Sequence, residues 1–284
     1  MATKSFQQTL TSSFVISQYL ADDLLGKQTH QQIKVHSVFP NGFNLDLQGQ
    51  LIFVGKHGGD LSAFGLTLDA TVFSQLQKIL VVGQRVRITP TAWTFYSRPN
   101  LLQLVPGHVE KVAVDIVPVT LEQLKTSALE ESLEAANVYA QSGFAQRTDM
   151  TQLMAEYQVA VQNSGDFLQP DLLRQFIGAG IGLTPSGDDF LQGMLLLEQA
   201  VGRGKVLSDS VQAALQERST TAVSYAYYQA LFAGKVNLSW VKLLTAIKTD
   251  NTGQLKAAVQ QIQAYGATSG NDILLGMLNV LKFI

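Results

Sequence analysis

Two stretches of this chain place hydroxyl and carboxylate side chains directly before an apolar segment. The first reads Gly-Ala-Gly-Ile-Gly-Leu-Thr-Pro-Ser-Gly-Asp-Asp over residues 178–189, and the second reads Gly-Ala-Thr-Ser-Gly-Asn-Asp over residues 266–272. Both continue in the pattern x-Leu-x-Gly-Met-Leu. We call them the first and second junctions. Because two loop-to-helix junctions share one design, the sequence predicts that they form one composite site.

The residues in these junctions that could act as acids, bases or orienting groups are the carboxylates Asp188, Asp189 and Asp272. The candidate ligand-binding residues around them are Gly180, Gly182, Thr184, Ser186, Gly187, Thr268, Ser269, Gly270 and Asn271. Backbone N–H groups at Gly182, Ser186, Gly187 and Gly270 are expected to hold phosphate or carboxylate, as helix N-termini do.

The neighbouring carboxylates would repel a bare anion, and this conflict restricts the ligand. It is resolved if the ligand carries N–H donors for the aspartates, as a ureido or amide compound does, if a basic residue shares the pocket, or if a divalent cation bridges the groups. The candidate basic residues are Lys56, Arg98, Arg147 and Arg174, and the sequence does not choose among them. It predicts no metal-ligand set and no cofactor.

A purely structural interpretation of the junctions is also available. Serine followed three residues later by an acid is typical of a helix capping box, and carboxylates favour the positive end of a helix. The glycine run is longer than a cap needs, however, and the pattern recurs near the C-terminus. These two features favour a ligand site. A dinucleotide fingerprint is excluded because the preceding segment is helical, and a phosphate-binding P-loop is excluded because no lysine follows.

Two further places carry weaker candidates. His57, in the turn Lys-His-Gly-Gly-Asp over residues 56–60, could exchange a proton near neutral pH, although such a sequence is usually only a turn. Thr220 and Thr221 could line the pocket from a neighbouring helix, although hydroxyls in helices commonly bond to their own backbone.

The elements that must position these residues fall into two classes, so the expected fold class is α+β. A helix is expected over residues 1–27, a β-rich, barrel-like domain over 28–119 and an all-helical domain over 120–284. Short alternating runs and an Asn-Gly turn at residues 41–42 predict the hairpins of the β-rich domain. Helices are expected over 69–80 within it and, beyond it, over 120–141, 150–163, from Pro170, from the first junction to about 201, over 209–233, 239–247 and 252–265, and from the second junction.

Composition excludes several functions. The net charge of −2 and a pI near 6.1 give no electrostatic case for nucleic acid or an anionic membrane. Without cysteine there is no disulfide and no thiolate chemistry. No run approaches the roughly 20 apolar residues of a membrane span, so a cytoplasmic protein is expected. Charged residues make up only 15%, against about 25% in typical domains, which predicts burial against a partner or a second copy, or simply an uncharged polar surface.

The motifs of this chain resemble those of a known family. The first junction, Gly-x-Gly-x-Gly-Leu-Thr-Pro-Ser-Gly-Asp-Asp, with Ser-Thr-Thr at 219–221 and Gly-Ala-Thr-Ser-Gly-x-Asp at 266–272, is similar to the AllH-type subunit of oxamate carbamoyltransferase. The resemblance is sharpest over 176–197 and 264–280. It implies a role in allantoin and purine breakdown, within a complex of several subunits that converts oxalurate and phosphate to oxamate and carbamoyl phosphate.

If the resemblance holds, oxalurate offers ureido N–H groups to the aspartates and a carboxylate to the helix starts. Asp188 or Asp189 is then expected to orient the amide nitrogen. Two other functions stay open: a non-catalytic ligand-binding or scaffolding subunit, and a metal-dependent hydrolase that uses the three aspartates. The last is least favoured because no histidine lies near the junctions in the sequence.

Overall fold

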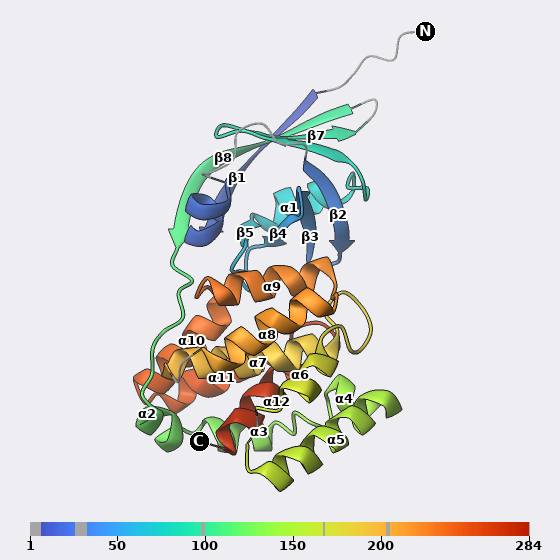
Figure 1. Ribbon diagram of the computed structural model, residues 1–284. Coiled ribbons are helices and arrows are strands. Elements are labelled where there is room, and N and C mark those ends of the chain that lie inside the picture. The colour runs from blue at the N-terminus through green and yellow to red at the C-terminus, as the bar shows by residue number, and fades with distance from the viewer. Residues whose placement is uncertain (1–6, 26–32, 98–99, 167, 203–204, 284) are drawn as a thin grey trace. The chain divides into compact units, whose positions relative to one another are not determined.

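The computed structural model describes residues 7–25, 33–97, 100–166, 168–202 and 205–283. The chain divides into two compact units, Met1–Val114 and Asp115–Ile284. The first unit is a closed β-barrel and the second consists of helices (Figure 1). The expected α+β class, with a barrel-like N-terminal part and a helical C-terminal part, is therefore confirmed.

Eight strands close the barrel in the order β1-β5-β4-β3-β2-β6-β7-β8. They are β1 Gln7–Ser17, β2 Ile33–Phe39, β3 Gly42–Leu47, β4 Gln50–Lys56, β5 Gly65–Leu68, β6 Arg85–Ile88, β7 Trp93–Ser97 and β8 Asn100–Val112. Most neighbours are antiparallel, but β4 pairs with β5 in parallel and β1 pairs with β8 in parallel. The second of these pairings joins the two ends of the sheet. The expected Asn-Gly hairpin links β2 to β3, where Phe39 pairs with Gly42.

Inward-facing side chains that alternate along the strands fill the barrel. In β1 the buried apolar residues are Leu10, Phe14 and Ile16. Phe43 of β3 stacks on Phe73, which lies in the α-helix α1 (Ala70–Gln77). This period of two is the pattern of a sheet with one buried face, and it explains why the β-rich texture of the sequence predicts the barrel.

The expected helix at residues 1–27 is wrong over the part that is described. Residues 7–17 form β1, and a single turn-rich segment at Tyr19–Leu25 is a π-helix. The apolar spacing of four between Leu10 and Phe14 fits a helix, but it also fits a strand, because four is a multiple of two. The pairing partner decides between them, and β8 lies about ninety residues further along the chain, beyond the reach of local pattern.

The helical unit contains α2 Leu121–Thr126, α3 Leu129–Ala135, α4 Gly143–Gln146, α5 Thr148–Ser164, α6 Pro170–Phe176, α7 Ser186–Val201, α8 Val206–Glu217, α9 Ala222–Phe232, α10 Leu238–Lys248, α11 Thr252–Gln263 and α12 Ser269–Leu281. Thr120 and Gln123 form a capping box at the start of α2. Two long helices of the prediction are each divided. The one over 120–141 breaks at Ser127, and the one over 209–233 breaks before Thr221, whose hydroxyl caps a new helix.

Helices α7 and α12 lie at the centre of this unit's core. Their side chains are buried on nearly all sides, as the all-round apolar sequence predicts. Aromatic rings surround the start of α7: Phe190 stacks on Phe176 and meets Phe144 edge-on. Each large apolar side chain buried in this way contributes roughly 1.5–3 kcal/mol, so the two helix starts are firmly placed.

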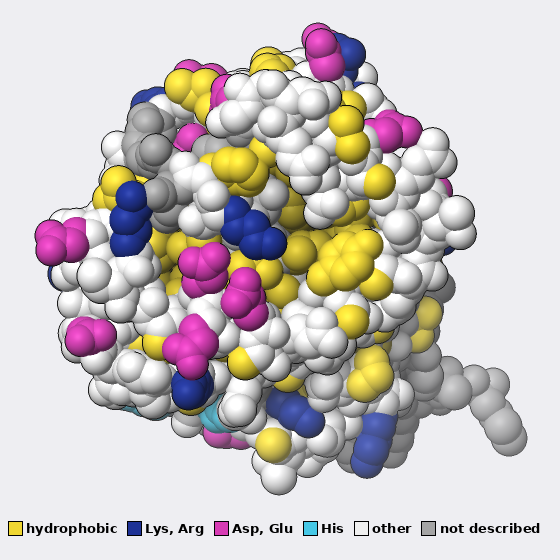
Figure 2. All heavy atoms as spheres, turned by 90° about the horizontal axis from the view of Figure 1, so that it is seen from below, with side chains coloured by type: hydrophobic (Ala, Val, Ile, Leu, Met, Phe, Trp, Pro, Cys, Tyr) yellow, Lys and Arg dark blue, Asp and Glu magenta, His cyan; other side chains and the backbone are white. Residues whose placement is uncertain are grey.

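No helix of the described residues is long and apolar enough to cross a bilayer. Figure 2 shows one face of the molecule, on which hydrophobic and uncharged polar side chains predominate and line a hollow. The few basic and acidic side chains on this face are intermingled. A surface of this kind has no single-sign field to attract a polyanion.

Candidate functional site

The two junctions lie side by side. Ser186 is the first residue of α7 and Ser269 is the first residue of α12. Thr184, two residues before α7, shares a hydrogen bond of 2.7 Å between its Oγ1 and Oγ of Ser269. Residues that are 85 positions apart in the sequence therefore meet at one place, as the repeated motif predicts.

The contact between α7 and α12 is reciprocal. A Cβ at Gly193 would overlap the carbonyl oxygen of Ile273, and a Cβ at Gly276 would overlap the carbonyl oxygen of Phe190. Each glycine is the seventh residue after its junction serine, and each carbonyl belongs to the fourth. The glycine of the x-Leu-x-Gly-Met-Leu pattern is needed because the two backbones touch there.

The glycine inside each Ser-Gly-x-Asp motif has a similar reason. A Cβ at Gly187 would overlap the carbonyl oxygen of Phe176 in α6, and a Cβ at Gly270 would overlap that of Ile262 in α11. In both junctions the helix start is therefore pressed against the helix that precedes it. The shared sequence encodes a shared local packing.

Neither serine caps its own helix. The capping positions are Pro185 and Thr268, and neither makes a side-chain cap hydrogen bond. The Ser269 hydroxyl instead stabilises the charged form of Asp189 on the other helix, and the Ser186 hydroxyl does the same for Asp272. The capping-box interpretation thus does not account for the motif.

Asp188 is fully occupied by protein donors. Its carboxylate accepts hydrogen bonds from the Thr220 hydroxyl at 2.5 Å, the Tyr228 hydroxyl at 3.1 Å and the Gly178 N–H at 3.2 Å. Burial raises the pKa of Asp188 to about 6, although these three donors act in the opposite direction. The carboxylate ties the glycine loop to α9.

Asp189 and Asp272 occupy the same position in their two motifs, three residues after the serine. Burial raises the pKa of Asp189 well above its usual range, and the charges of Asp272 and Asp188 raise it further. Burial likewise raises the pKa of Asp272 to about 6. Oδ1 of Asp272 accepts a hydrogen bond of 2.8 Å from the Gly143 N–H. Burial of two carboxyls that interact through their charges favours the neutral form of at least one of them.

Several polar atoms in this cluster lack a partner. Oδ2 of Asp189 and Oδ2 of Asp272 are buried, and the described residues offer neither of them a well-aligned donor. Nε2 of Gln192, one turn further along α7, is buried without an acceptor among the same residues. Unpaired buried groups are rare in native proteins. Two acceptors and one donor together could bind an amide, which offers N–H groups and a carbonyl oxygen.

The cluster is closed to solvent in this structure. Asp188, Asp189 and Asp272 expose 0, 1 and 0% of their surface. The residues above them are more open: Thr184, Thr268 and Ser269 are half-buried and Gly182 is exposed. A ligand that touches the aspartates must therefore displace some of the protein atoms that cover them.

Part of the expected anion site is wrong. The Gly187 N–H donates to the carbonyl of Ala179 at 2.9 Å, and the Gly270 N–H donates to the carbonyl of Tyr265 at 3.2 Å. Both groups are thus used within the loops. Within the described residues, the N–H groups of Gly182 and Ser186 donate no backbone hydrogen bond of this kind. These two groups are still candidates for binding a phosphate or carboxylate.

The alternating glycines of the first junction differ in their surroundings. Gly178 and Gly180 have φ of 71° and 118°, and a Cβ would lie 2.8 Å from the Ser219 carbonyl oxygen or 2.7 Å from the Ser186 nitrogen. Gly182 has φ of 85° but nothing lies within 4 Å of its Cβ position. The first two glycines are therefore needed because the protein's own backbone lies close to them, whereas Gly182 lies in open space.

The remaining candidates of the helical unit support the junctions. Thr220 binds Asp188, and Thr221 donates from Oγ1 to the carbonyl oxygen of Leu183 at 2.5 Å. Asn271 is buried and its Oδ1 accepts from Nε2 of Gln263 at 3.0 Å. The Ser-Thr-Thr segment, which precedes α9, therefore holds the first junction in place. That these threonines line a ligand pocket stays a prediction.

The candidate basic residues are engaged elsewhere or lie outside this unit. Arg147 pairs with Asp149 at 2.8 Å, and Arg174 pairs with Glu217 at 2.9 Å. Lys56 belongs to the barrel unit, and Arg98 lies outside the described residues. The groups that stabilise the charged forms of the three buried aspartates are hydroxyls and N–H groups. Within the described residues, no three His, Asp or Glu side chains gather so as to hold a metal ion.

His57 lies in the barrel unit, not in the cluster. Its Nδ1 is 2.8 Å from Oγ1 of Thr67, and its Nε2 is 3.3 Å from Oδ1 of Asp69. The Oδ2 atom of Asp69 accepts a hydrogen bond from the N–H of Ser13 in β1. His57 is thereby part of a contact that ties the end of β5 to β1.

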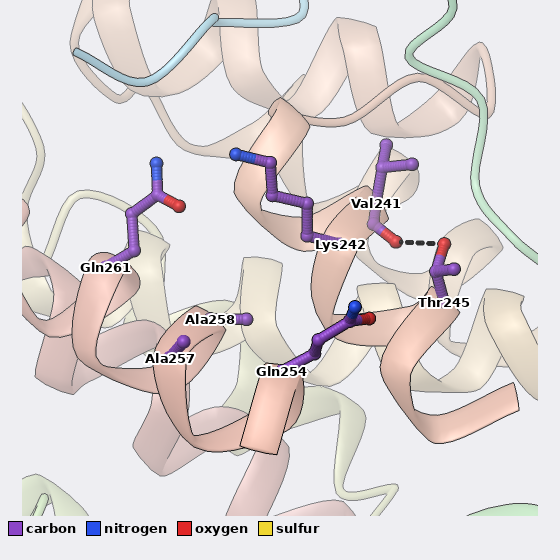
Figure 3. Close-up of a pocket in the computed structure, with 7 residues that line it drawn as sticks. All are labelled: Val241, Lys242, Thr245, Gln254, Ala257, Ala258 and Gln261. Atoms are coloured by element: carbon purple, nitrogen blue, oxygen red, sulfur yellow. Dashed lines mark hydrogen bonds between the residues drawn. The ribbon is translucent and has the colours of Figure 1, made fainter. Parts of the chain in front are cut away.

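A separate hollow lies between α10 and α11 (Figure 3). It has a volume of about 420 Å³ and is lined by Val241, Lys242, Thr245, Gln254, Ala257, Ala258 and Gln261. Its charged lining residue is Lys242, and the Thr245 hydroxyl already donates to the carbonyl of Val241. The hollow contains none of the residues predicted from the sequence.

Three residues of the cluster were not predicted from the sequence. Gly143 contributes only a backbone N–H to Asp272, and no pattern connects positions 129 apart. Tyr228 is one of several nearby tyrosines, and which of them is buried depends on where α9 begins. Gln192 has the clearest signal, because it is a polar residue between apolar neighbours one turn after Asp189.

Two family models match the chain. The model of the oxamate carbamoyltransferase subunit AllH matches residues 176–281, and the model of the AllH family N-terminal domain matches residues 9–105. No solved structure matches the chain significantly. The first match spans both junctions, and the second spans most of the barrel.

Proposed function

This chain belongs to the family of the AllH subunit of oxamate carbamoyltransferase, and we propose that it serves a cytoplasmic complex that interconverts oxalurate plus phosphate with oxamate plus carbamoyl phosphate. We further propose that the paired junctions bind the ureido or amide part of the substrate. The observation that carries this proposal is the meeting of Asp189 and Asp272, each with a buried oxygen that lacks a donor.

The unpaired atoms suit a carbamoyl group. Oδ2 of Asp189 and Oδ2 of Asp272 can accept N–H groups, and Nε2 of Gln192 can donate to a carbonyl oxygen. A site built to bind N–H groups rejects analogues that lack them, because its own polar atoms would stay unpaired. Asp188 is assigned a positioning role, since protein donors already occupy its carboxylate.

The reaction requires one proton to move. A phosphate oxygen attacks the carbamoyl carbon, the bond from that carbon to the oxamate nitrogen breaks, and the phosphate's proton passes to that nitrogen. A carboxyl that carries a proton near neutral pH can relay it. Burial and the neighbouring charges raise the pKa of Asp189 toward such a state, so Asp189 is our candidate for this role.

Complete burial of the aspartates favours a second candidate function, a non-catalytic scaffolding subunit. Asp188, Asp189 and Asp272 expose 0, 1 and 0% of their surface, so they could serve only to hold α7 and α12 together. In that case the junctions would matter for assembly and not for turnover.

The two functions are separated by measuring phosphate released from carbamoyl phosphate and oxamate. The assay compares the purified chain, the chain co-purified with the other subunits, and those other subunits without it. Turnover by the chain alone supports the proposal. Turnover that is restored only when the chain joins the other subunits fits both functions, and its loss in an assembled complex that carries Asp189→Asn then supports the proposal. Equal turnover by the other subunits without this chain would rule it out.

A further inference from the structure

Three apolar side chains are exposed beside the junction site. Ile181, Leu183 and Tyr225 expose 68, 38 and 42% of their surface. They belong to one surface, because the Thr221 hydroxyl binds the Leu183 carbonyl and Tyr225 follows Thr221 by one turn on the same side of α9. We call these three residues the loop-tip patch. Single exposed apolar residues need no explanation, but a group next to a polar site marks an interaction surface.

The loop that carries this patch is held on both sides of its exposed tip, residues 181–183. Gly178 is held by its N–H bond to Asp188, and Thr184 is held by Ser269. Between them, Gly182 adopts φ of 85° although nothing lies within 4 Å of its Cβ position. No internal neighbour demands this conformation, which presents Ile181 and Leu183 outward on either side.

Among the described residues, no lysine or arginine forms an ion pair with the three aspartates beneath the loop. Arg147 and Arg174 are paired with acids outside the cluster, and among the described residues only hydroxyls and N–H groups stabilise the buried carboxylates. The proposed reaction brings phosphate and a substrate carboxylate to this place. Two anions beside Asp189 and Asp272 need positive charge, which arginine or lysine provides in phosphoryl and carboxylate sites.

We propose that another subunit of the carbamoyltransferase docks on the loop-tip patch and brings a basic side chain that binds phosphate at the junction site. This chain would then recognise the neutral carbamoyl part of the substrate, and the partner would recognise the anion. The inference rests on the proposed function, since it assumes that an anionic substrate is used here.

A second copy of this chain fits the patch less well. It would meet Ile181 and Leu183 with the same apolar side chains, but it would bring a second set of carboxylates and no additional cation from its own patch. A different subunit can satisfy both needs, the apolar contact and the missing charge. We therefore propose a different subunit, and not a second copy of this chain, as the partner.

The docking is tested with the double variant Ile181→Ser, Leu183→Ser, co-expressed with the other subunits of the complex. The matched control is Val159→Ser, Val206→Ser, whose side chains expose 55 and 58% of their surface on α5 and α8. Sedimentation velocity should show that the double variant binds its partners about tenfold or more weakly, whereas the control assembles normally. Both variants should melt at the wild-type temperature, since the substituted side chains are exposed. Tyr225→Ser provides an independent variant of the same surface.

The charge is tested by calorimetric titration with inorganic phosphate. The assembled complex should bind phosphate, and the isolated chain should bind it at least about tenfold more weakly, as expected for loss of a charged contact. Normal assembly of the double variant would overturn the proposal. So would equal phosphate affinity of the isolated chain, or a dimer of the isolated chain that the double variant dissociates. Full turnover by Asp189→Asn in an intact complex would refute the proposed function instead, and it would leave the assembly measurement unaffected.

Discussion

At the scale of single residues, the motif Ser-Gly-x-Asp has two kinds of aspartate. Asp189 and Asp272 are equivalent, and each is approached by the serine of the opposite helix. Asp188 has no counterpart, because Asn271 stands in its place. The spacing in the sequence predicts that these residues meet. It does not predict that Asp188 is saturated by Gly178, Thr220 and Tyr228, because those donors come from three separate segments.

Asp188→Asn is expected to destabilise the fold without removing the ligand groups. An amide keeps one acceptor oxygen but turns an N–H₂ group toward donors, so one or two buried hydrogen bonds are lost. The expected loss in the free energy of unfolding is about 1–3 kcal/mol, measured by urea denaturation. Asp209→Asn is the control, since Asp209 is an exposed acid in the first turn of α8. Equal midpoints for both variants would contradict the structural role.

The pH dependence of stability follows from the same residues. Burial raises the pKa of Asp188 and of Asp272 to about 6, above the value of about 3.9 in an unfolded chain. The folded state therefore binds more protons between these values, so their contribution to stability is fully present below about pH 4 and is lost as the pH rises through 6. Asp22, Asp69 and Asp149, whose pKa is lowered, titrate below this window.

Urea denaturation at intervals from pH 4.5 to 7.5 measures this slope. The free energy of unfolding should fall with rising pH by an amount on the order of a few kcal/mol. Asp272→Asn should flatten the slope, because it removes one of the titrating groups. A free energy of unfolding that rises over this range in the wild-type chain would show that these carboxyls stay ionised when buried.

At the scale of elements, the site depends on how closely α7 and α12 approach. Gly193 and Gly276 allow the two backbones to touch, and Gly187 and Gly270 allow each helix start to meet the preceding helix. The glycines in the shared pattern were visible in the sequence, but their reciprocal contact was not, because it depends on the relative position of two helices 83 residues apart. The apolar character and shared pattern of the two helices predict that they are buried and pack together, but not which backbone atoms touch.

Gly276→Ala tests this packing. Alanine favours a helix by about 1 kcal/mol relative to glycine, but here its Cβ would overlap the carbonyl oxygen of Phe190. The helices must then separate, with an expected net loss of about 1–3 kcal/mol. Gly253→Ala in α11 is the matched control, because its Cβ would meet only an ordinary contact 3.6 Å away. Thermal melting should lower the midpoint for Gly276→Ala and keep or raise it for Gly253→Ala; the reverse order would contradict the close packing.

The elements also show where sequence patterns stop being informative. The barrel strands were predicted because alternation and the Asn-Gly turn are local signals. The strand β1 was mistaken for a helix because its partner β8 is distant in the sequence. The division between α8 and α9 was missed because the Thr221 cap depends on its contact with Leu183, which is tertiary.

At the scale of the whole molecule, the candidate residues are unequally divided between the two units. His57 belongs to the barrel, and the other candidate site residues belong to the helical unit. The helical unit has its own core, in which Phe144, Phe176 and Phe190 pack together. The sequence predicts this division from its change of texture near residue 119, because strand and helix periods differ over long stretches.

A chain that starts at Asp115 is therefore expected to fold alone. Its core contains the aromatic cluster, and the junctions depend on contacts made within the unit. Circular dichroism should show a helical protein with a cooperative melt, and the amide spectrum in NMR should be dispersed. A non-cooperative melt of this chain would mean that the barrel is required for the helical core.

The most direct measurement of the central claim is turnover by the assembled complex that carries Asp189→Asn. Phosphate release from carbamoyl phosphate and oxamate should fall by about a hundredfold or more, since the residue is proposed to orient the carbamoyl group and relay a proton. Asp209→Asn should keep full turnover, and both variants should assemble normally. Wild-type turnover by an intact complex that carries Asp189→Asn would contradict the claim that the paired junctions are the functional site.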